Sequence, residues 1–271
     1  MEAEKIVTNP DWLTVAAIAI VTHSLTVSIH EAIGHGGACL VVGCAPRLVT
    51  TMQFKGDEDS LPRLAVDAIS AGGSVANLIA AAIAILLIRR YRGPARTGWF
   101  FLWLFATVNL LAAAGYPLYS GLANIGDWAN IVRGLKPSWL WHLLLAAIGA
   151  PSYWFATRWA MDRLGRRLSH RVSRVPEAYR YTLVSYLAMG ALAIIGGMFE
   201  SGGAFLVLIS AAAASLGGAS ALAWGPQLLQ DPHLGEPPEE PLQVLRDARW
   251  MIAAALAGLA FVTVLGPGIR L

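Results

Sequence analysis

The stretch GWFFLWLFATVNLLAAAGYPLYSGLANIG, residues 98–126, contains no aspartate, glutamate, lysine or arginine. The hydrocarbon core of a membrane is about 30 Å thick, and a helix of about 20 apolar residues crosses it. Lipid offers no hydrogen-bonding partners, so a spanning segment must satisfy its own backbone groups, as a helix does. This stretch therefore predicts a transmembrane helix.

Long charge-free stretches recur along the rest of the chain, at residues 68–88, 138–157, 181–199, 201–230 and 250–269. Charged residues make up only 14% of the 271 residues and hydrophobic residues 56%, whereas a soluble domain carries about 25% charged residues. A soluble protein with a large core does not account for this pattern. We predict an all-α fold, a polytopic transmembrane helix bundle of about six to seven spans.

The expected spans are residues 12–43, 66–91, 98–116, 138–159, 181–199, 202–224 and 250–265. The first is too long for one simple span, so we expect a break or an interfacial end within it. Pro117 lacks a backbone donor, and the third span is expected to stop or kink at Gly115-Tyr116-Pro117. Residues 118–133 would then form a half-helix or a second piece of the same pass.

Arginines cluster in two connections, at residues 89–96 and 158–180. The positive-inside rule places both on the cytoplasmic side, with the N-terminus inside and residues 44–65 outside. We interpret the arginines as topology signals in contact with membrane lipid, and expect no nucleic-acid partner. The chain shows no cleavable signal pattern, and we expect an integral multi-pass protein of a bacterial-type plasma membrane.

Two further features carry no predicted chemistry. The connection 225–247 is rich in proline and acidic residues and is expected to be an irregular cytoplasmic loop. Cys39 and Cys44 are too few for a disulfide framework, and Cys39 is expected to act as a small apolar filler.

The motif HEAIGH at residues 30–35 places three ionisable groups within the first span. Such groups are expensive in a membrane and are candidates for function. Two imidazoles and a carboxylate suit Zn²⁺ (zinc), with the metal bound by histidine nitrogens and Glu31 acting on water. The alternative is that these side chains only make helix–helix hydrogen bonds.

The spacing of the two histidines is unusual. His30 and His35 are five residues apart, which on a regular helix separates them by about 140°. A single π-helical turn, with Gly34 as its irregular point, would return both to one face. Alternatively, Glu31 and His35 are the metal ligands and His30 assists in proton transfer. We favour the π-turn.

Three segments in order resemble the site-2 protease family of intramembrane zinc metalloproteases. They are HEAIGHGGA at residues 30–38, RLVTTMQF at 47–54 and AGGSVANL at 71–78. The family typically has H-E-x-G-H, a short β-rich extramembrane stretch and an A-G-P-x-A-N type motif. The resemblance covers residues 12–133 and implies strand pairing within 47–54. It also matches Asn77 to a substrate-facing asparagine, although an interhelical hydrogen bond explains Asn77 equally well.

The third ligand in this family is an aspartate in a P-L-D-G type motif preceded by an asparagine. Here Asn109 precedes GYPLYSG, residues 115–121, which has no aspartate. Asp127 is the nearest one, and we select it as the third metal ligand. Its alternative role is a helix cap at the membrane interface.

The resemblance implies that residues 1–134 form a metalloprotease-like membrane core and 135–271 add further helices. Zn²⁺ held by His30, His35 and Asp127 would serve hydrolysis of a membrane-embedded peptide, with Glu31 accepting a proton from water. A second hypothesis is a non-proteolytic membrane metalloprotein for transport or for chemistry on a lipid-soluble small molecule, which iron would also suit. A third is a structural subunit with a degenerate site.

Two other polar residues lie in or beside the spans. His23 shares the face of His30 on a regular helix, about 10 Å away along the axis, and is expected to line the same cavity or to bond a neighbouring helix. Glu200 is expected to end the fifth span on the outer side.

Overall fold

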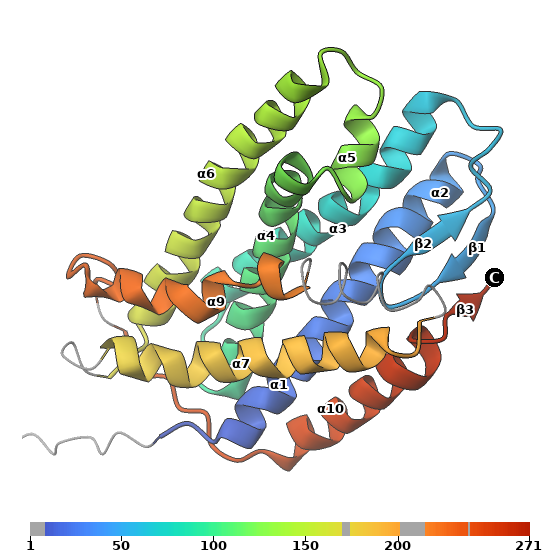
Figure 1. Cartoon of the computed structure of the whole chain (residues 1–271). Coiled ribbons are helices and arrows are strands. Elements are labelled where there is room, and N and C mark those ends of the chain that lie inside the picture. Colours follow the sequence, from blue (N-terminus) through green and yellow to red (C-terminus); the bar gives the residue numbers. More distant parts are fainter. Residues whose placement is uncertain (1–8, 170–173, 201–214, 238) are drawn as a thin grey trace, which may run out of the picture.

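The computed structural model describes residues 9–169, 174–200, 215–237 and 239–271, and helices dominate it as predicted (Figure 1). Within these ranges, five helices are long and apolar enough to cross a membrane. They span Trp12–Val41, Arg63–Arg90, Thr97–Ala123, Arg174–Gly197 and Ala248–Leu265. These helices indicate an integral multi-pass membrane protein.

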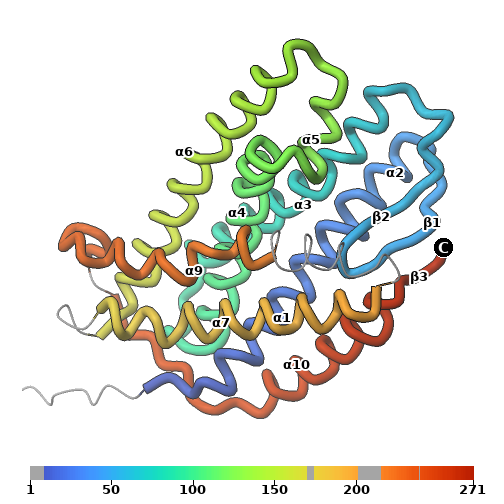
Figure 2. The backbone as a smooth tube through the Cα atoms, in the orientation of Figure 1, coloured from blue at the N-terminus to red at the C-terminus, as the bar shows by residue number. Residues whose placement is uncertain are grey.

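The first span is one unbroken helical run, which Figure 2 shows as a continuous tube. It begins as α1 (Trp12–Ser28), passes through the π-helix η1 (Ile29–Gly36) and ends as α2 (Gly37–Val41). The Asp11 carboxylate accepts a hydrogen bond from the backbone nitrogen of Thr14 and caps the start. The irregularity expected in this long segment is therefore a change of helix type in its middle.

The next helices are α3 (Arg63–Arg90), α4 (Thr97–Ala123), the short α5 (Asp127–Val132) and α6 (Ser138–Gly165). The third span was predicted to stop or kink at residues 115–117, and it does not stop there, because α4 continues through Pro117 to Ala123. Proline removes a single hydrogen bond, and the packing of α4 against α3 and α6 supports the helix beyond it.

The segment 118–133, predicted to be a half-helix or a second piece of the same pass, is divided between two helices. Its first part belongs to α4, which ends where Asn124 adopts a left-handed conformation with φ of 54°. Gly126, with φ of 89°, then redirects the chain into the separate helix α5. A left-handed residue commonly ends a helix, and glycine tolerates positive φ without strain.

The C-terminal half contains α7 (Arg174–Gly197), α9 (Ala221–Trp224), the 3-10 helix η3 (Gly225–Gln230), α10 (Ala248–Ala260) and the π-helix η4 (Phe261–Leu265). Both α7 and α10 pack against α1. The expected span 202–224 lies mostly outside the described residues. The connection expected to be irregular begins with η3.

Backbone hydrogen bonds gather the arginine-rich connections at one end of the molecule. Leu242 nitrogen donates to the Arg167 carbonyl at 2.7 Å, and Gln243 nitrogen donates to the Ala95 carbonyl at 2.8 Å. Asp11 nitrogen donates to the Val244 carbonyl at 2.8 Å. The start of α1, the α3–α4 connection and the end of α6 therefore lie together. A large apolar core is built nearby around the fully buried Phe100, Trp103, Leu104, Leu164 and Tyr181.

A small antiparallel sheet lies at the other end, with strand order β2–β1–β3. Strands β1 (Pro46–Val49) and β2 (Phe54–Gly56) form the predicted hairpin after the first span. The C-terminal strand β3 (Ile269–Arg270) pairs with β1 and was not predicted. Two residues are too short to carry a recognisable strand pattern.

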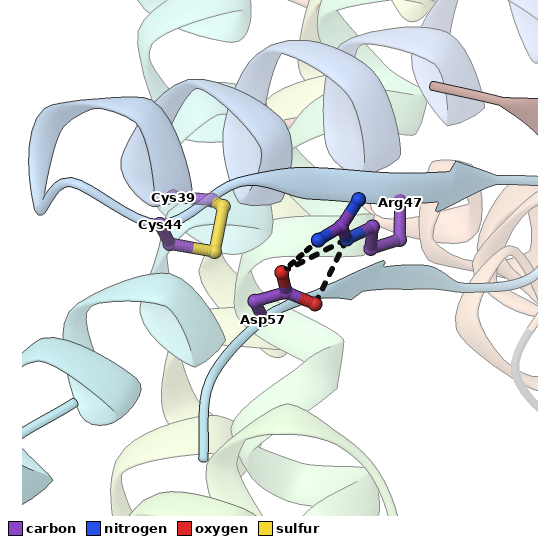
Figure 3. The surroundings of a disulfide bond; sticks show 4 residues. All are labelled: Cys39, Cys44, Arg47 and Asp57. Carbon is purple, nitrogen blue, oxygen red and sulfur yellow. Dashed lines mark hydrogen bonds and ion pairs between the residues drawn. A yellow bond between two sulfur atoms is a disulfide. The ribbon is translucent and has the colours of Figure 1, made fainter. Parts of the chain in front are cut away.

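The expectation that Cys39 is a small apolar filler was wrong, because Cys39 and Cys44 form a disulfide (Figure 3). The helical run ends at Val41, and Gly43 turns the chain back with φ of 81°. Cys44 is thereby returned beside Cys39. The disulfide ties the end of the first span to the start of the hairpin.

An ion pair reinforces the same hairpin (Figure 3). The Nε atom of Arg47 donates to both carboxylate oxygens of Asp57 at 2.9 Å. The Arg47 hydrogen bonds hold the pKa of Asp57 below its usual value. Both side chains are exposed, so the pair orders this loop more than it stabilises the fold.

Candidate metal centre

The π-helix η1 brings His30 and His35 onto one face. A π-turn closes hydrogen bonds between residues five apart, so side chains with that spacing lie above one another. The ring centroids of the two histidines are 4.8 Å apart. The predicted π-turn is therefore confirmed. Because the π-turn places both histidines on one face, the alternative in which Glu31 and His35 are the metal ligands is not needed.

Asp127 completes a three-residue cluster with these histidines. Its Oδ2 atom lies 3.2 Å from Nε2 of His30 and 3.3 Å from Nε2 of His35. Asp127 is the first residue of α5, while the N-cap position is Gly126. Its carboxylate faces the two histidine rings. The buried group His30, His35 and Asp127 could hold a metal ion.

Two side-chain contacts with α3 hold helix α5 in place. An Nη atom of Arg63, at the start of α3, donates to the carbonyl oxygens of Asn130 at 2.6 Å and of Ile131 at 2.9 Å. The indole nitrogen of Trp128 donates to the Ser74 hydroxyl at 3.0 Å. Both contacts fix α5 against α3, which positions the aspartate that α5 carries.

The side-chain amides of Asn77 and Asn109 orient the His30 ring through its Nδ1 atom. The Nδ2 atom of Asn77 donates to Oδ1 of Asn109 at 2.7 Å, and the Asn109 amide donates to the Thr26 hydroxyl at 3.0 Å. The Asn77 oxygen is thereby left facing Nδ1 of His30, at 2.6 Å. Nδ1 of His30 is then the donor, and Nε2 is directed at Asp127.

His35 is oriented in the same sense by a backbone carbonyl. Its Nδ1 atom lies 2.7 Å from the carbonyl oxygen of Ile69. A carbonyl only accepts hydrogen bonds, so Nδ1 carries the hydrogen here also. The Phe54 ring of β2 stacks on the other side of the imidazole at 6.4 Å between centroids. A neutral His35 therefore also presents a bare Nε2 lone pair to Asp127.

Gly73 of α3 and Gly34 of η1 allow the two helices to approach closely at the histidines. A Cβ added to Gly73 would lie 2.5 Å from Nε2 of His30 and 2.7 Å from Nε2 of His35. A Cβ on Gly34 would lie 2.6 Å from Cα of Gly73. No side chain fits at either position without displacing the site. The run of small residues in the sequence signals close packing, but not that Gly73 faces the imidazoles.

The cluster fits Zn²⁺ in its chemistry and in the two separations that involve Asp127. Zinc is bound by histidine nitrogen at about 2.0–2.1 Å in a tetrahedron, which separates neighbouring ligand atoms by about 3.3 Å. The separations from Asp127 to the two histidines match this value, and all three ligand atoms lie within 4.8 Å of one another. Three protein ligands leave one position open, as in catalytic zinc sites.

A cavity of about 320 Å³ adjoins the cluster. Glu31, which is buried, and His30 line one end of it, and His23 lies further along the same helix. Tyr153 of α6 and Met189 of α7 form part of the opposite wall. The remaining lining is largely apolar. A molecule in this cavity would be in contact with both Glu31 and His30 of the cluster.

Three other predicted positions can be placed. Asn77 lines the cavity and is fully buried. Its contact with substrate stays a prediction, beside its hydrogen bond to His30. Gly115 and Tyr116 line the cavity from an unbroken α4. Glu200 follows the end of α7, where it is buried and accepts a hydrogen bond from Gln53 of the hairpin turn at 3.0 Å.

Comparisons of the chain with protein-family models, with curated proteins and with solved structures find no match.

Proposed function

We propose that this chain is a zinc-dependent hydrolase that cleaves peptide segments within the membrane. The observation that carries the proposal is the convergence of three electron-rich atoms. Both histidines direct Nε2 at Oδ2 of Asp127 while their Nδ1 atoms donate elsewhere. Two imidazoles and a carboxylate in this arrangement are held together either by protons on the Nε2 atoms, as in ion pairs of the two histidines with Asp127, or by a metal cation among them. A divalent metal satisfies all three ligands at once.

Glu31 is the group that would handle the proton in hydrolysis. It is buried beside the cluster and lines the cavity. Its carboxylate would accept a proton from the attacking water and deliver it to the leaving amine. Zn²⁺, when bound, supplies Lewis acidity toward the scissile carbonyl. Asn77 and the Ile69 carbonyl keep the two imidazoles turned toward the site.

The position of the site suggests how the chain is oriented. The cluster lies toward the end of the first span, beside the disulfide and the sheet. The arginine-rich connections lie at the other end (Figure 1). Disulfides persist in oxidising compartments, and arginine-rich loops stay in the cytoplasm. Both features support an orientation in which the cluster lies near the outer face of the membrane and the N-terminus lies inside.

A second candidate function is hydrolysis of an amide or ester in a lipid-soluble small molecule. The size of the cavity favours it, since about 320 Å³ lies within the range of small-molecule sites. A peptide would have to unwind locally and enter as an extended segment. The same residues would carry both reactions, so only the substrate distinguishes them.

Metal content tests the proposal first. The detergent-purified protein should contain about one zinc per chain by elemental analysis, because three protein ligands make one site. His30→Ala, His35→Ala and Asp127→Ala should each lose it. His233→Ala is the matched control, because His233 is exposed and outside the cluster. A metal-free wild type purified without chelators would overturn the proposal.

Activity is tested next with Glu31→Gln, which preserves the size of the side chain. The wild type is reconstituted in liposomes with a pool of transmembrane peptides, and cleavage is read by mass spectrometry. Glu31→Gln should keep its zinc and lose cleavage. If the wild type cleaves no peptide but hydrolyses lipid amides or esters, the second candidate replaces the first. If Glu31→Gln cleaves as well as the wild type, Glu31 is not the proton acceptor.

A further inference from the structure

His23 is a buried polar group that the proposed reaction does not use. It lies on α1, seven residues before His30, and its side chain lines the same cavity. The residue is 6% exposed. No group in the described part of the chain forms a hydrogen bond with its Nε2 atom. The imidazole therefore lines the cavity while one of its nitrogens is buried without a hydrogen-bonding partner.

The surroundings of His23 offer it no polar partner. The Phe261 ring packs against it with centroids 5.4 Å apart. Val108, Met189 and Ala193 are among the apolar residues that line the same cavity. A buried polar atom without a partner destabilises a fold, and a leucine of similar size would avoid this loss. The arrangement is explained if the partner of His23 enters through the cavity.

We propose that His23 is a specificity-determining residue that hydrogen-bonds a polar group of the substrate. This inference rests on the proposed function, because it takes the metal cluster as the place of cleavage. Seven residues of helix separate His23 from His30 by about 10 Å. The recognised group lies at that distance from the cleaved bond. In an extended peptide this is about three residues away.

The chemistry of the recognised group follows from the imidazole. A neutral imidazole has one donor and one acceptor nitrogen, so it suits a hydroxyl, a carbonyl or an amide. A purely apolar substrate would fill the cavity but leave His23 unpaired. The enzyme should therefore discriminate between substrates of equal length by a single polar group.

Two hydroxamic acids test this inference without knowledge of the natural substrate. Octanoyl hydroxamate and 8-hydroxyoctanoyl hydroxamate both chelate zinc, and their chains of about eight carbons extend roughly 10 Å. The second carries a hydroxyl where His23 lies. Binding of each to the zinc-loaded protein is measured by calorimetry in detergent. A hydroxyl without a hydrogen-bonding partner weakens binding in an apolar cavity. Tighter binding of the hydroxylated compound therefore indicates a partner for its hydroxyl, and weaker binding indicates that it has none.

We expect the wild type to bind the hydroxylated compound about tenfold more tightly. His23→Leu should reverse this preference and still bind the unsubstituted compound and one zinc. His23→Gln, which retains a donor and an acceptor, should keep the preference. Equal binding of both compounds by the wild type would overturn the inference, even if His23→Leu failed to fold. So would an unchanged preference in a folded His23→Leu.

The same experiment separates failure of this inference from failure of the proposed function. If the wild type holds no zinc and binds neither compound, the metal site itself is absent and both proposals fall. If the wild type binds both compounds equally through zinc, the metal site stands and only the role of His23 is refuted.

Discussion

The side-chain oxygen of Asn77 lies 2.6 Å from Nδ1 of His30, while the nitrogen of the same amide bonds Asn109. Residues from α3 and α4 together therefore decide which way the His30 ring faces and which of its nitrogens is free. Partners of this kind commonly change metal affinity 10- to 100-fold when they are removed.

Replacement of Asn77 by leucine should weaken zinc binding by about 10- to 100-fold, because His30 loses the acceptor that orients it. Asn77→Asp retains an oxygen facing Nδ1 and should lose less affinity. Zinc affinity is measured by competition with a chromogenic chelator. An Asn77→Leu protein with wild-type affinity would show that the hydrogen bond does not position His30.

Gly73→Ala should abolish zinc binding although it removes no ligand. The new Cβ would lie 2.5 Å from Nε2 of His30, so the ring must move away from Asp127. Gly37→Ala is the matched control, since a Cβ at Gly37 meets no atom within 4 Å. Zinc per chain in the two purified variants checks this. Equal zinc content in both variants would mean that α3 moves away from η1 to admit the new methyl group without any loss of zinc binding.

Arg63→Ala should lower zinc affinity about fivefold, a loss of about 1 kcal/mol, because α5 loses the contacts that hold Asp127 in place. Arg133→Ala is a suitable control. Arg133 bonds the Asn130 side chain within the α5 region and does not link it to α3. The prediction fails if the two variants bind zinc equally well.

Cys39 and Cys44 should resist maleimide labelling until a reductant is added, since both sulfurs are in the disulfide. Mass spectrometry of the alkylated protein measures this. Replacing both cysteines with alanine should remove about 2 kcal/mol of stability for so short a loop, which appears as a lower thermal midpoint. Full labelling of the unreduced protein would contradict the pairing.

Local sequence was sufficient for the membrane class and for most helices. A charge-free stretch such as residues 98–126 can satisfy its backbone in lipid only as a helix, whatever surrounds it. Local sequence was misleading at Pro117, where the break depends on whether neighbouring helices support the chain beyond it. It was also misleading at Cys39, whose partner is reached only through the turn at Gly43.

The sequence by itself determined the membrane class and the HEAIGH motif, because each depends on residue type and short spacing, and the family resemblance led to the choice of Asp127. Only the tertiary structure decided that the ligands meet. Asp127 is separated from His30 by almost a hundred residues, and its distance to the imidazoles depends on how closely α3 approaches η1 and holds α5. Such contacts join segments distant in sequence, and no local pattern encodes them.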